Sequence, residues 1–248
     1  MSTMDQKEWF LDWFDSPYYP ILYQKRDDCE AQWFLDNLLQ QLHCSPGASI
    51  IDIACGKGRH SKYLSQKGFK VTGIDLAGNA IAHAKQFENE RLSFYVHDMR
   101  KPFRINYYDY AFNLFTSLGY FASQNDNFLA IKTLNNSLKV GGTGIIDFFN
   151  ATKVRQDLVP EETKSMSGID FKISKRIEGR ILIKSIQFEA EQRTYDFQEK
   201  VQLLTINDFN QWFNAVGLKV EHLYGDYSLG SYHEATSERL IIQVRKTI

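Results

Sequence analysis

Two aspartates flank a glycine-rich turn in the stretch SIIDIACGKGRHSKYLSQKGFKVTGIDLAG. Asp52 lies near the end of one apolar run, the turn with Gly56 and Gly58 follows it, and Asp75 ends the next apolar run. In the dinucleotide-binding pattern GxGxxG, the glycines allow a tight turn, a close approach of the ligand and close packing of helix on strand. Ser61 stands in place of the third glycine, so the glycines alone are weak evidence for a nucleotide site.

The two carboxylates indicate which nucleoside this turn could hold. Asp75 follows the turn by about 20 residues, where a carboxylate can accept hydrogen bonds from both hydroxyls of a ribose; the alternative is that it caps the next helix. Asp52 would repel a pyrophosphate at the helix N-terminus but would attract an ammonium or a sulfonium group. S-adenosylmethionine carries both of these cations and a ribose. The turn therefore favours S-adenosylmethionine, and a nicotinamide dinucleotide is the alternative ligand.

Strands and helices alternate from Ser49 onward, and these elements must position the turn. The sequence predicts strands over 49–54, 70–76, 92–99, 107–115 and 143–150. It predicts helices over 60–68, 79–89 and 127–142, the last of them ending at its paired glycines. Strands that are separated by helices of about a dozen residues indicate an α/β fold with a parallel sheet covered on both faces.

The two flanking regions have different patterns, which divide the chain into three parts. Residues 1–45 are predicted to form an N-terminal helical cap, interrupted by Pro17 and Pro20, and residues 5–30 of this cap a mobile lid. Residues 46–150 and 205–248 form the predicted core, in which Thr205 begins a helix that Gly217 ends and two further strands follow. Residues 151–204 are predicted to be a β insert of three antiparallel strands, over 171–178, 180–191 and 195–204.

The insert carries more large apolar residues than three short strands need for one buried face. They are Phe171, Ile173, Ile181, Ile183, Ile186 and Phe188. We expect this surface to roof the active site, because the insert follows the fifth strand, whose C-terminal end borders the predicted ligand. The alternative is that the surface forms a subunit interface, so the protein is expected to be a monomer or a homodimer.

Composition excludes several classes of protein. A chain of 248 residues with 43% hydrophobic and 24% charged residues can bury one sizeable core. Its formal net charge of -1 offers no cationic field for a polyanion. The three cysteines have neither disulfide nor zinc spacing, and no stretch resembles a signal peptide or a membrane span. We therefore expect a cytoplasmic protein with no metal, no nucleic-acid partner and no membrane partner.

The motifs DIACGKGRH, GIDLAGNAI, HDMR, NLFTSLGYF and LKVGG, in this order, resemble the class I S-adenosylmethionine-dependent methyltransferases. The resemblance covers the chain from Tyr18 to Arg245. It is strongest to small-molecule enzymes with an antiparallel insert after the fifth strand, such as the amino-sugar N-methyltransferases of macrolide pathways. It implies a doubly wound, Rossmann-like sheet of seven mostly parallel strands whose last strand is antiparallel, and SERLIIQVRK fits that strand. Val140 replaces the proline that usually precedes the paired glycines.

The resemblance also implies a cofactor site. Around the methionine part it places Asp52, the backbone of Ala54, Cys55, Gly56 and Gly58, and the residues Asn113 and Leu114. Asp75 should hold the ribose and Leu76 should lie against the adenine, while Asp98 accepts a hydrogen bond from the adenine amino group and Met99 packs on the ring. In the N-terminal segment, Tyr23 would be a lid residue and Arg26 a partner of the methionine carboxylate.

Methyl transfer from a sulfonium is an in-line displacement that releases the neutral thioether S-adenosylhomocysteine. Its rate can come mostly from proximity and alignment, and a base is needed only if the acceptor arrives protonated. The candidates for such a base are His233, Tyr120 and Tyr227, whereas His60 is expected to pack or to contact the cofactor.

The expected activity is that of a methyltransferase acting on a small-molecule acceptor. No NPPY or DPPY motif follows the fourth strand, and no Pro-Cys motif of cytosine C5 enzymes is found. N-methylation is favoured over O-methylation. The alternatives are an NAD(P)-dependent oxidoreductase and a catalytically silent module that binds S-adenosylmethionine.

Overall fold

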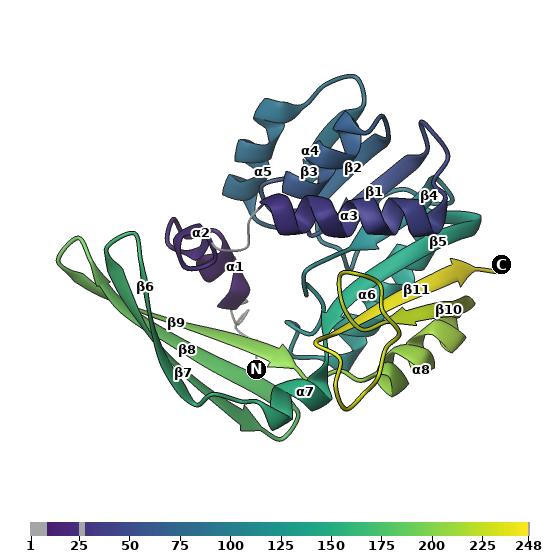
Figure 1. The fold of residues 1–248 in the computed structure, drawn as a ribbon. Helices are drawn as coiled ribbons and strands as arrows, with labels where there is room; N and C mark the ends of the chain where they lie inside the picture. Colours follow the sequence, from purple (N-terminus) through teal and green to yellow (C-terminus); the bar gives the residue numbers. More distant parts are fainter. Residues whose placement is uncertain (1–8, 25–27, 248) are drawn as a thin grey trace, which may run out of the picture.

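A computed structural model describes residues 9–24 and 28–247, which form a large mixed sheet with helices on both faces and a separate smaller sheet (Figure 1). The helices are α1 (Trp9–Phe14), α2 (Tyr19–Leu22), α3 (Asp28–Leu42), α4 (Arg59–Gln66), α5 (Gly78–Ala84), the short 3-10 helix η1 (Lys85–Phe87), α6 (Gln124–Ser137), α7 (Ala151–Gln156) and α8 (Ile206–Val216). The strands are β1 (Ser49–Ile53), β2 (Lys70–Asp75), β3 (Leu92–Val96), β4 (Tyr108–Asn113), β5 (Leu138–Phe149), β6 (Glu161–Met166), β7 (Ile169–Glu178), β8 (Ile181–Ala190), β9 (Arg193–Gln202), β10 (Leu218–Tyr224) and β11 (Arg239–Lys246).

The large sheet has seven strands in the order β10-β11-β5-β4-β1-β2-β3. β1 pairs in parallel with β2 and β4, and β11 is antiparallel to both of its neighbours, β5 and β10. This arrangement confirms the predicted doubly wound α/β fold, including the antiparallel last strand. The strand order reverses at β1, so a crevice opens between the C-terminal ends of β1 and β4, where ligands bind in such sheets.

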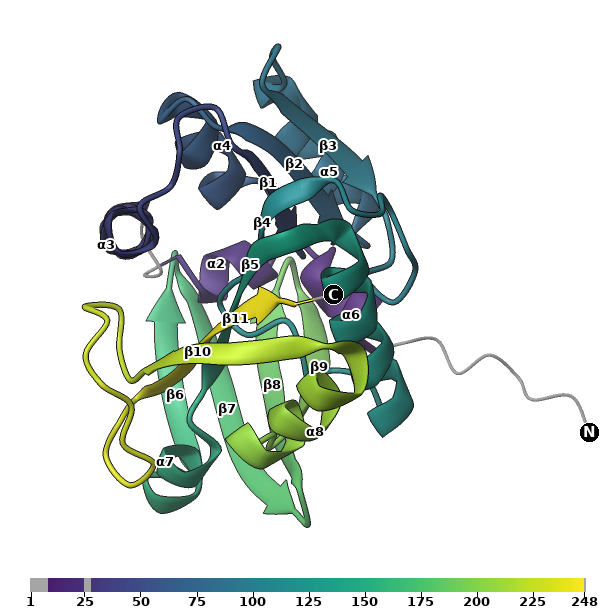
Figure 2. The same cartoon turned by 90° about the vertical axis from the view of Figure 1, so that its right-hand side faces the viewer.

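Helices bury both faces of this sheet (Figures 1 and 2). On one face α3, α4 and α5 contribute side chains such as Phe34, Leu64 and Ile81 to a single apolar cluster. On the other face α6 and α8 contribute Ile131 and Phe209 to a second cluster. Because both faces are covered, successive residues of the inner strands β1 and β2 are buried on both sides of the sheet.

The paired glycines near residue 141 do not end a helix, as the sequence predicted. α6 ends at Ser137, and β5 already begins at Leu138. The pairing of β4 with β5 passes from Tyr108–Leu138 directly to Tyr110–Thr143. The residues between, including the exposed Val140, therefore form a bulge that leads into the strand, and the glycines serve this bulge.

The β insert has four strands, in the order β6-β7-β8-β9, rather than the three predicted (Figure 2). The missing strand is β6, whose sequence EETKSM is almost entirely polar and gave no apolar alternation. β6 lies at the edge of the sheet and pairs with β7 alone. Charged edge strands of this kind limit pairing with other chains.

The apolar face of the insert is covered by the N-terminal helices. Figures 1 and 2 both show α1 and α2 against the sheet β6–β9. Trp13, Tyr18 and Leu22 pack with Phe171 and Phe188 in one buried cluster. The insert and helices α1 and α2 therefore form one packed unit, which buries four of the six large apolar residues of the insert: Phe171, Ile173, Ile186 and Phe188.

Candidate functional site

Two adjoining cavities open at the C-terminal ends of β1, β2 and β4. The larger has a volume of about 340 Å³ and the smaller about 80 Å³. Both are lined by Phe14, Ala54, Asp75, Ser117 and Tyr120. Since the same side chains border both, the two cavities form one elongated cleft, with Asp75 where they meet.

The turn after β1 is shaped by left-handed backbone at three alternate residues, Ala54, Gly56 and Gly58. At Gly58 (φ 80°) a Cβ atom would lie 2.5 Å from the ring of Phe94. Gly73 on β2 has the same restriction, since its Cβ would also lie 2.5 Å from that ring. In GxGxxG turns, glycine allows the helix to pack closely on the strand. Here Gly58 and Gly73 allow the Phe94 ring to pack closely against the turn and β2.

Asp75 closes the turn from the side of β2. Its Oδ2 accepts the backbone N–H of Gly56 and its Oδ1 accepts that of Ala77, both at 2.8 Å. Burial raises the pKa of this carboxyl, although the backbone donors act against it. Asp75 thus holds the backbone on both sides of the cleft and lines the cleft with its carboxylate, but it does not cap α5, because Ala77 precedes the first residue of that helix.

Asp52 lies behind the turn rather than in the cleft. Only 1% of its surface is exposed, and its Oδ2 accepts a hydrogen bond of 2.6 Å from Ser61 Oγ. It is not among the described residues that line either cavity. Burial raises the pKa of Asp52 to about 7. The serine that replaces the third glycine is therefore the partner of this carboxyl, and Asp52 supports the turn from below.

His60 forms part of the wall of the larger cavity. Its ring is 6% exposed and stacks on Phe115 with 4.9 Å between centroids. Burial, helped by the charge of Arg59, lowers its pKa to about 3, so the imidazole is neutral. Within the described residues its Nε2 has no hydrogen-bond partner. A buried polar atom without a partner in a cavity wall is suited to a polar ligand.

The smaller cavity is mainly apolar, with Asp98 as a second carboxylate besides Asp75. Leu76, Met99 and Phe121 line it together with Asp98. Burial acts to raise the pKa of Asp98, but the hydrogen bonds from Arg100 outweigh it and lower the pKa. The Asp98–Arg100 ion pair, at 2.8 Å, was not predicted. A mainly apolar cavity with a fixed carboxylate in its wall suits a heterocycle that carries an amino group.

A continuous row of aromatic rings lines the larger cavity, and we call it the aromatic wall. It runs from Tyr120 through Phe14 and Tyr19 to Tyr23. Successive ring centroids are 5.2, 4.9 and 4.9 Å apart. Phe14 and Tyr19 were not predicted as site residues, although they belong to the aromatic segment that the sequence placed in the cap.

The loop after β4 forms the opposite side of the cavity. Leu114 lines it, whereas Asn113 is buried behind it and donates to the carbonyl of Ile53 at 3.1 Å. The loop is held by Asp147 of β5, which accepts the N–H of Phe115 at 2.8 Å and pairs with Arg239 at 2.7 Å. This support from β5 and β11 was not foreseen.

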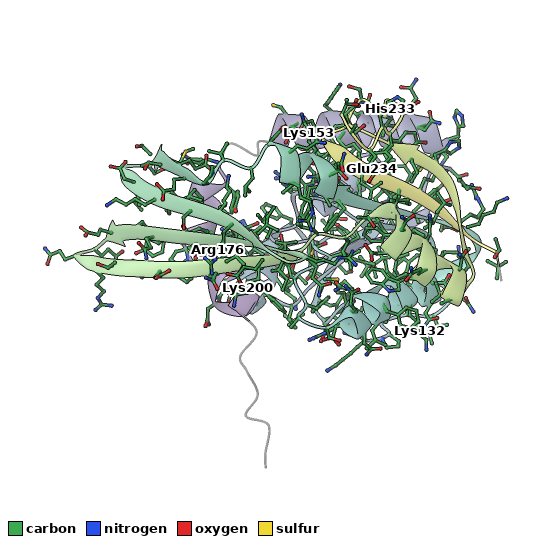
Figure 3. All side chains as sticks on the ribbon, turned by 90° about the horizontal axis from the view of Figure 1, so that it is seen from below. Lys132, Lys153, Arg176, Lys200, His233 and Glu234 are labelled. Carbon is green, nitrogen blue, oxygen red and sulfur yellow. The ribbon has the colours of Figure 1, made fainter. Side chains whose placement is uncertain are left out.

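The predicted base candidates lie in different places. Tyr120 belongs to the aromatic wall. Tyr227 lies one layer behind, with its ring 5.2 Å from that of Phe115 and its hydroxyl 3.3 Å from Asp147, and burial raises its pKa. His233 is exposed on a turn beside Glu234, at an edge of the core (Figure 3), and is not among the described residues that line the cleft.

Positive charge in the wall of the larger cavity comes from residues that the sequence did not assign. Lys57 and Arg59 line the larger cavity, and the Arg59 guanidinium lies 4.4 Å from the centroid of Phe115. Arg26, the predicted partner of the methionine carboxylate, falls outside the described residues. Lys57 and Arg59 both belong to the motif GKGRH, in which only the glycines and the histidine were assigned to the cofactor site from the sequence.

Two features of the described residues bear on other functions. They contain no group of three or more His, Cys, Asp or Glu side chains placed to bind a metal ion. None of the helices in 9–24 and 28–247 is both long and apolar enough to cross a membrane.

Comparisons with known proteins identify relatives of this chain. Residues 50–142 match the protein family described as Methyltransferase domain. One relative is the Bacillus subtilis protein YqeM, which is named as a methyltransferase. It is 26% identical over 213 residues, which are 80% of this chain and 84% of that one. The dTDP-3-amino-3,4,6-trideoxy-alpha-D-glucopyranose N,N-dimethyltransferase of Streptomyces venezuelae is 22% identical over 188 residues, covering 72% and 78% of the two chains.

Solved structures show the same fold. An S-adenosylmethionine-dependent methyltransferase from Clostridium acetobutylicum superposes with a TM-score of 0.77 and 19% identity, covering 92% of this chain and 95% of that one. The sugar N-methyltransferase KedS8 from a Streptoalloteichus species gives a TM-score of 0.72 and 20% identity, with 93% of each chain covered. Together with the family match, these relatives confirm the resemblance seen in the sequence: the chain is an S-adenosylmethionine-dependent methyltransferase.

Proposed function

We propose that this enzyme transfers a methyl group to the nitrogen of a small amine. The proposal begins with the orientation of the cofactor in the cleft. The smaller cavity would hold the adenine between Leu76 and Met99, with its amino group on Asp98. Asp75, where the two cavities meet, would hold the ribose. The methionine part would then extend into the larger cavity.

The methionine part would lie along the turn after β1. The backbone of Ala54, Cys55 and Gly56 lines the larger cavity on this side. Lys57 and Arg59 are placed to attract the methionine carboxylate, and the Nε2 of the neutral His60 can share a hydrogen bond with a polar group of the ligand. Asp52 would act through Ser61 and the turn, without touching the cofactor.

The aromatic wall is the observation that favours an amine as acceptor. Four contiguous rings line the larger cavity, in which the methyl group would lie. An aromatic face attracts a nearby cation by about 0.5–2 kcal/mol, so such a wall favours an ammonium, or an amine that becomes positively charged as it is methylated. A neutral hydroxyl gains little from it. The relatives named as sugar N-methyl- and N,N-dimethyltransferases support the same acceptor class.

The chain contributes mainly alignment and exclusion of water. The bound cofactor supplies an electrophilic methyl group with a neutral thioether as leaving group. Leu114 and Phe115 on one side and the aromatic wall on the other would confine the acceptor nitrogen in line with that methyl group, and such alignment can contribute several kcal/mol. On these two sides the cavity wall is largely apolar or aromatic, which would keep water away from the reacting nitrogen.

A turnover screen tests the proposal. Purified enzyme and S-adenosylmethionine are mixed with 3-amino-3-deoxyglucose, tyramine or phenethylamine, and in parallel with the matched alcohols glucose, tyrosol and 2-phenylethanol. Release of S-adenosylhomocysteine is followed by mass spectrometry, together with the mass of each acceptor. We expect methylation of at least one amine and none of the matched alcohols. Methylation of alcohols alone would refute the choice of nitrogen.

A further inference from the structure

A pair of opposite charges lies at the far end of the aromatic wall, on the inner face of the insert. Glu199 on β9 is 9% exposed, and its Oε2 lies 3.5 Å from the ammonium of Lys184 on β8. The two residues are directly opposite each other in the register of these strands. A nearly buried ion pair adds little to stability by itself, so its position next to the site calls for an explanation.

Tyr23 connects this pair to the cavity. Its ring closes the aromatic wall and lines the larger cavity. Its hydroxyl donates to Glu199 Oε1 at 2.6 Å and accepts a short hydrogen bond from Lys184. The proton of this phenol is therefore directed at a carboxylate outside the cavity, and Lys184 fixes the position of its oxygen.

Several other titratable groups in the wall of the larger cavity are poorly suited to take a proton from an acceptor. His60, with a pKa of about 3, does not hold a proton near neutral pH. Both oxygens of Asp75 already accept backbone N–H groups, and we assign this residue to the ribose. Tyr23 differs from these groups, because it can pass a proton on to a carboxylate.

Building on the proposed amine acceptor, we propose that Tyr23 and Glu199 form the proton-accepting pair that frees the nucleophile. The acceptor ammonium gives one proton to the Tyr23 oxygen while Tyr23 gives its own proton to Glu199 Oε1. The nitrogen keeps the electron pair of the broken N–H bond and uses it to form the bond to the methyl group. The methylated product leaves as an ammonium, and Glu199 then releases its proton to water.

A purely structural role for the same residues makes a different prediction. Trp13 Nε1 also donates to Glu199 Oε1, at 2.6 Å, so the carboxylate ties the N-terminal helices to the insert in any case. If Glu199 had only this structural function, removing one of its hydrogen bonds would disturb the aromatic wall to the same extent at every pH. A proton-accepting role affects turnover only where the acceptor arrives protonated.

The pH dependence of kcat separates the two roles. Glu199→Gln and Tyr23→Phe are compared with the wild type between pH 6 and 10, at saturating concentrations of the fastest amine in the screen above. The matched control is Trp13→Phe, which removes another hydrogen bond to the same oxygen and leaves the proposed proton path intact. Titration calorimetry with S-adenosylhomocysteine checks that each variant keeps its cofactor site.

We expect Glu199→Gln and Tyr23→Phe to lose on the order of 10²-fold in kcat at pH 7. This loss should shrink about tenfold per pH unit, until the amine is deprotonated without help. Trp13→Phe should show a small loss that is the same at every pH. A pH-independent loss in all three variants would overturn the proton-accepting pair while leaving N-methylation intact. If the wild type methylates no amine of the panel, both proposals fail.

Discussion

Replacing Asp75 with alanine would test the placement of the ribose most sharply. The structure gives this carboxylate two tasks: it holds the backbone N–H groups of Gly56 and Ala77, and it lines the cleft at the junction of its two cavities. Alanine removes both tasks. We therefore expect a loss of cofactor affinity together with a loss of stability in the unliganded protein.

The expected size of each effect follows from the contacts. A hydrogen bond to a charged group contributes about 1.5–3 kcal/mol, and two ribose hydroxyls partly compensated by water give roughly 2–4 kcal/mol. This corresponds to a dissociation constant that is about 30- to 1,000-fold higher. The N–H groups of Gly56 and Ala77 lose their acceptor as well, at about 1–3 kcal/mol for each one that stays buried.

Calorimetry with S-adenosylmethionine measures the first effect, and urea unfolding without cofactor measures the second. Asp75→Asn should fall between the wild type and Asp75→Ala in affinity, because one oxygen remains and an amide NH2 replaces the other. Asp109→Ala is the matched control: this aspartate pairs with Lys139 and Ser49, outside the described lining of the cleft. An unchanged dissociation constant for Asp75→Ala would show that the ribose does not bind there.

Three further predictions concern stability and the cap. The pKa of Asp52 is about 7 in the folded protein and about 3.9 in an unfolded chain. Because the folded state binds this proton more tightly, the free energy of unfolding falls as pH rises from about 4 to 7. Asp52→Asn should thus be more stable than the wild type at pH 8, by up to roughly 4 kcal/mol, and equally stable at pH 4; identical urea curves at pH 8 would contradict this. Gly58→Ala should lose more stability than Gly56→Ala, because both have positive φ but a Cβ meets the Phe94 ring only at Gly58; equal midpoints in urea would contradict that clash. A chain lacking residues 1–24 should bind cofactor more weakly and should bind a hydrophobic dye at the uncovered face of the insert. Unchanged affinity in that truncated chain would show that the cap does not close the cleft.

The order of strands and helices from β1 to β5 and the position of the turn could be predicted because they depend on local patterns. Apolar runs that end at Asp52 and Asp75 mark the ends of β1 and β2, and these ends meet at one edge of a parallel sheet. The cap of α8 could be predicted in the same way, since Thr205 and Asp208 are near in sequence; the Thr205 N–H donates to Asp208 Oδ2 at 2.8 Å.

The direction of the Asp52 side chain could not be predicted by the same means. β1 is buried on both faces, so its sequence shows no alternation that tells one face from the other. The hydrogen bond from Ser61 settles the direction in the structure. Ser61 was noticed only as a missing glycine, and its hydroxyl was not considered as a donor.

Contacts between distant parts of the chain were also beyond local patterns. Tyr23 and Glu199 are 176 residues apart, and Asp147 and Arg239 are 92 residues apart. Each pair depends on how separate elements pack, and neither has a spacing that a motif could record. The sequence did indicate that the insert needed a covering surface, but the identity of α1 and α2 as that cover required the structure.

A crystal structure with bound S-adenosylhomocysteine would test the central claim most directly, because every proposal above depends on how the cofactor lies in the cleft. We predict that both ribose hydroxyls lie within hydrogen-bonding distance of the Asp75 carboxylate and that the adenine amino group faces Asp98. The thioether sulfur should face the aromatic wall. A cofactor whose sulfur points away from Tyr120, Phe14, Tyr19 and Tyr23 would contradict both the amine site and the proton-accepting pair.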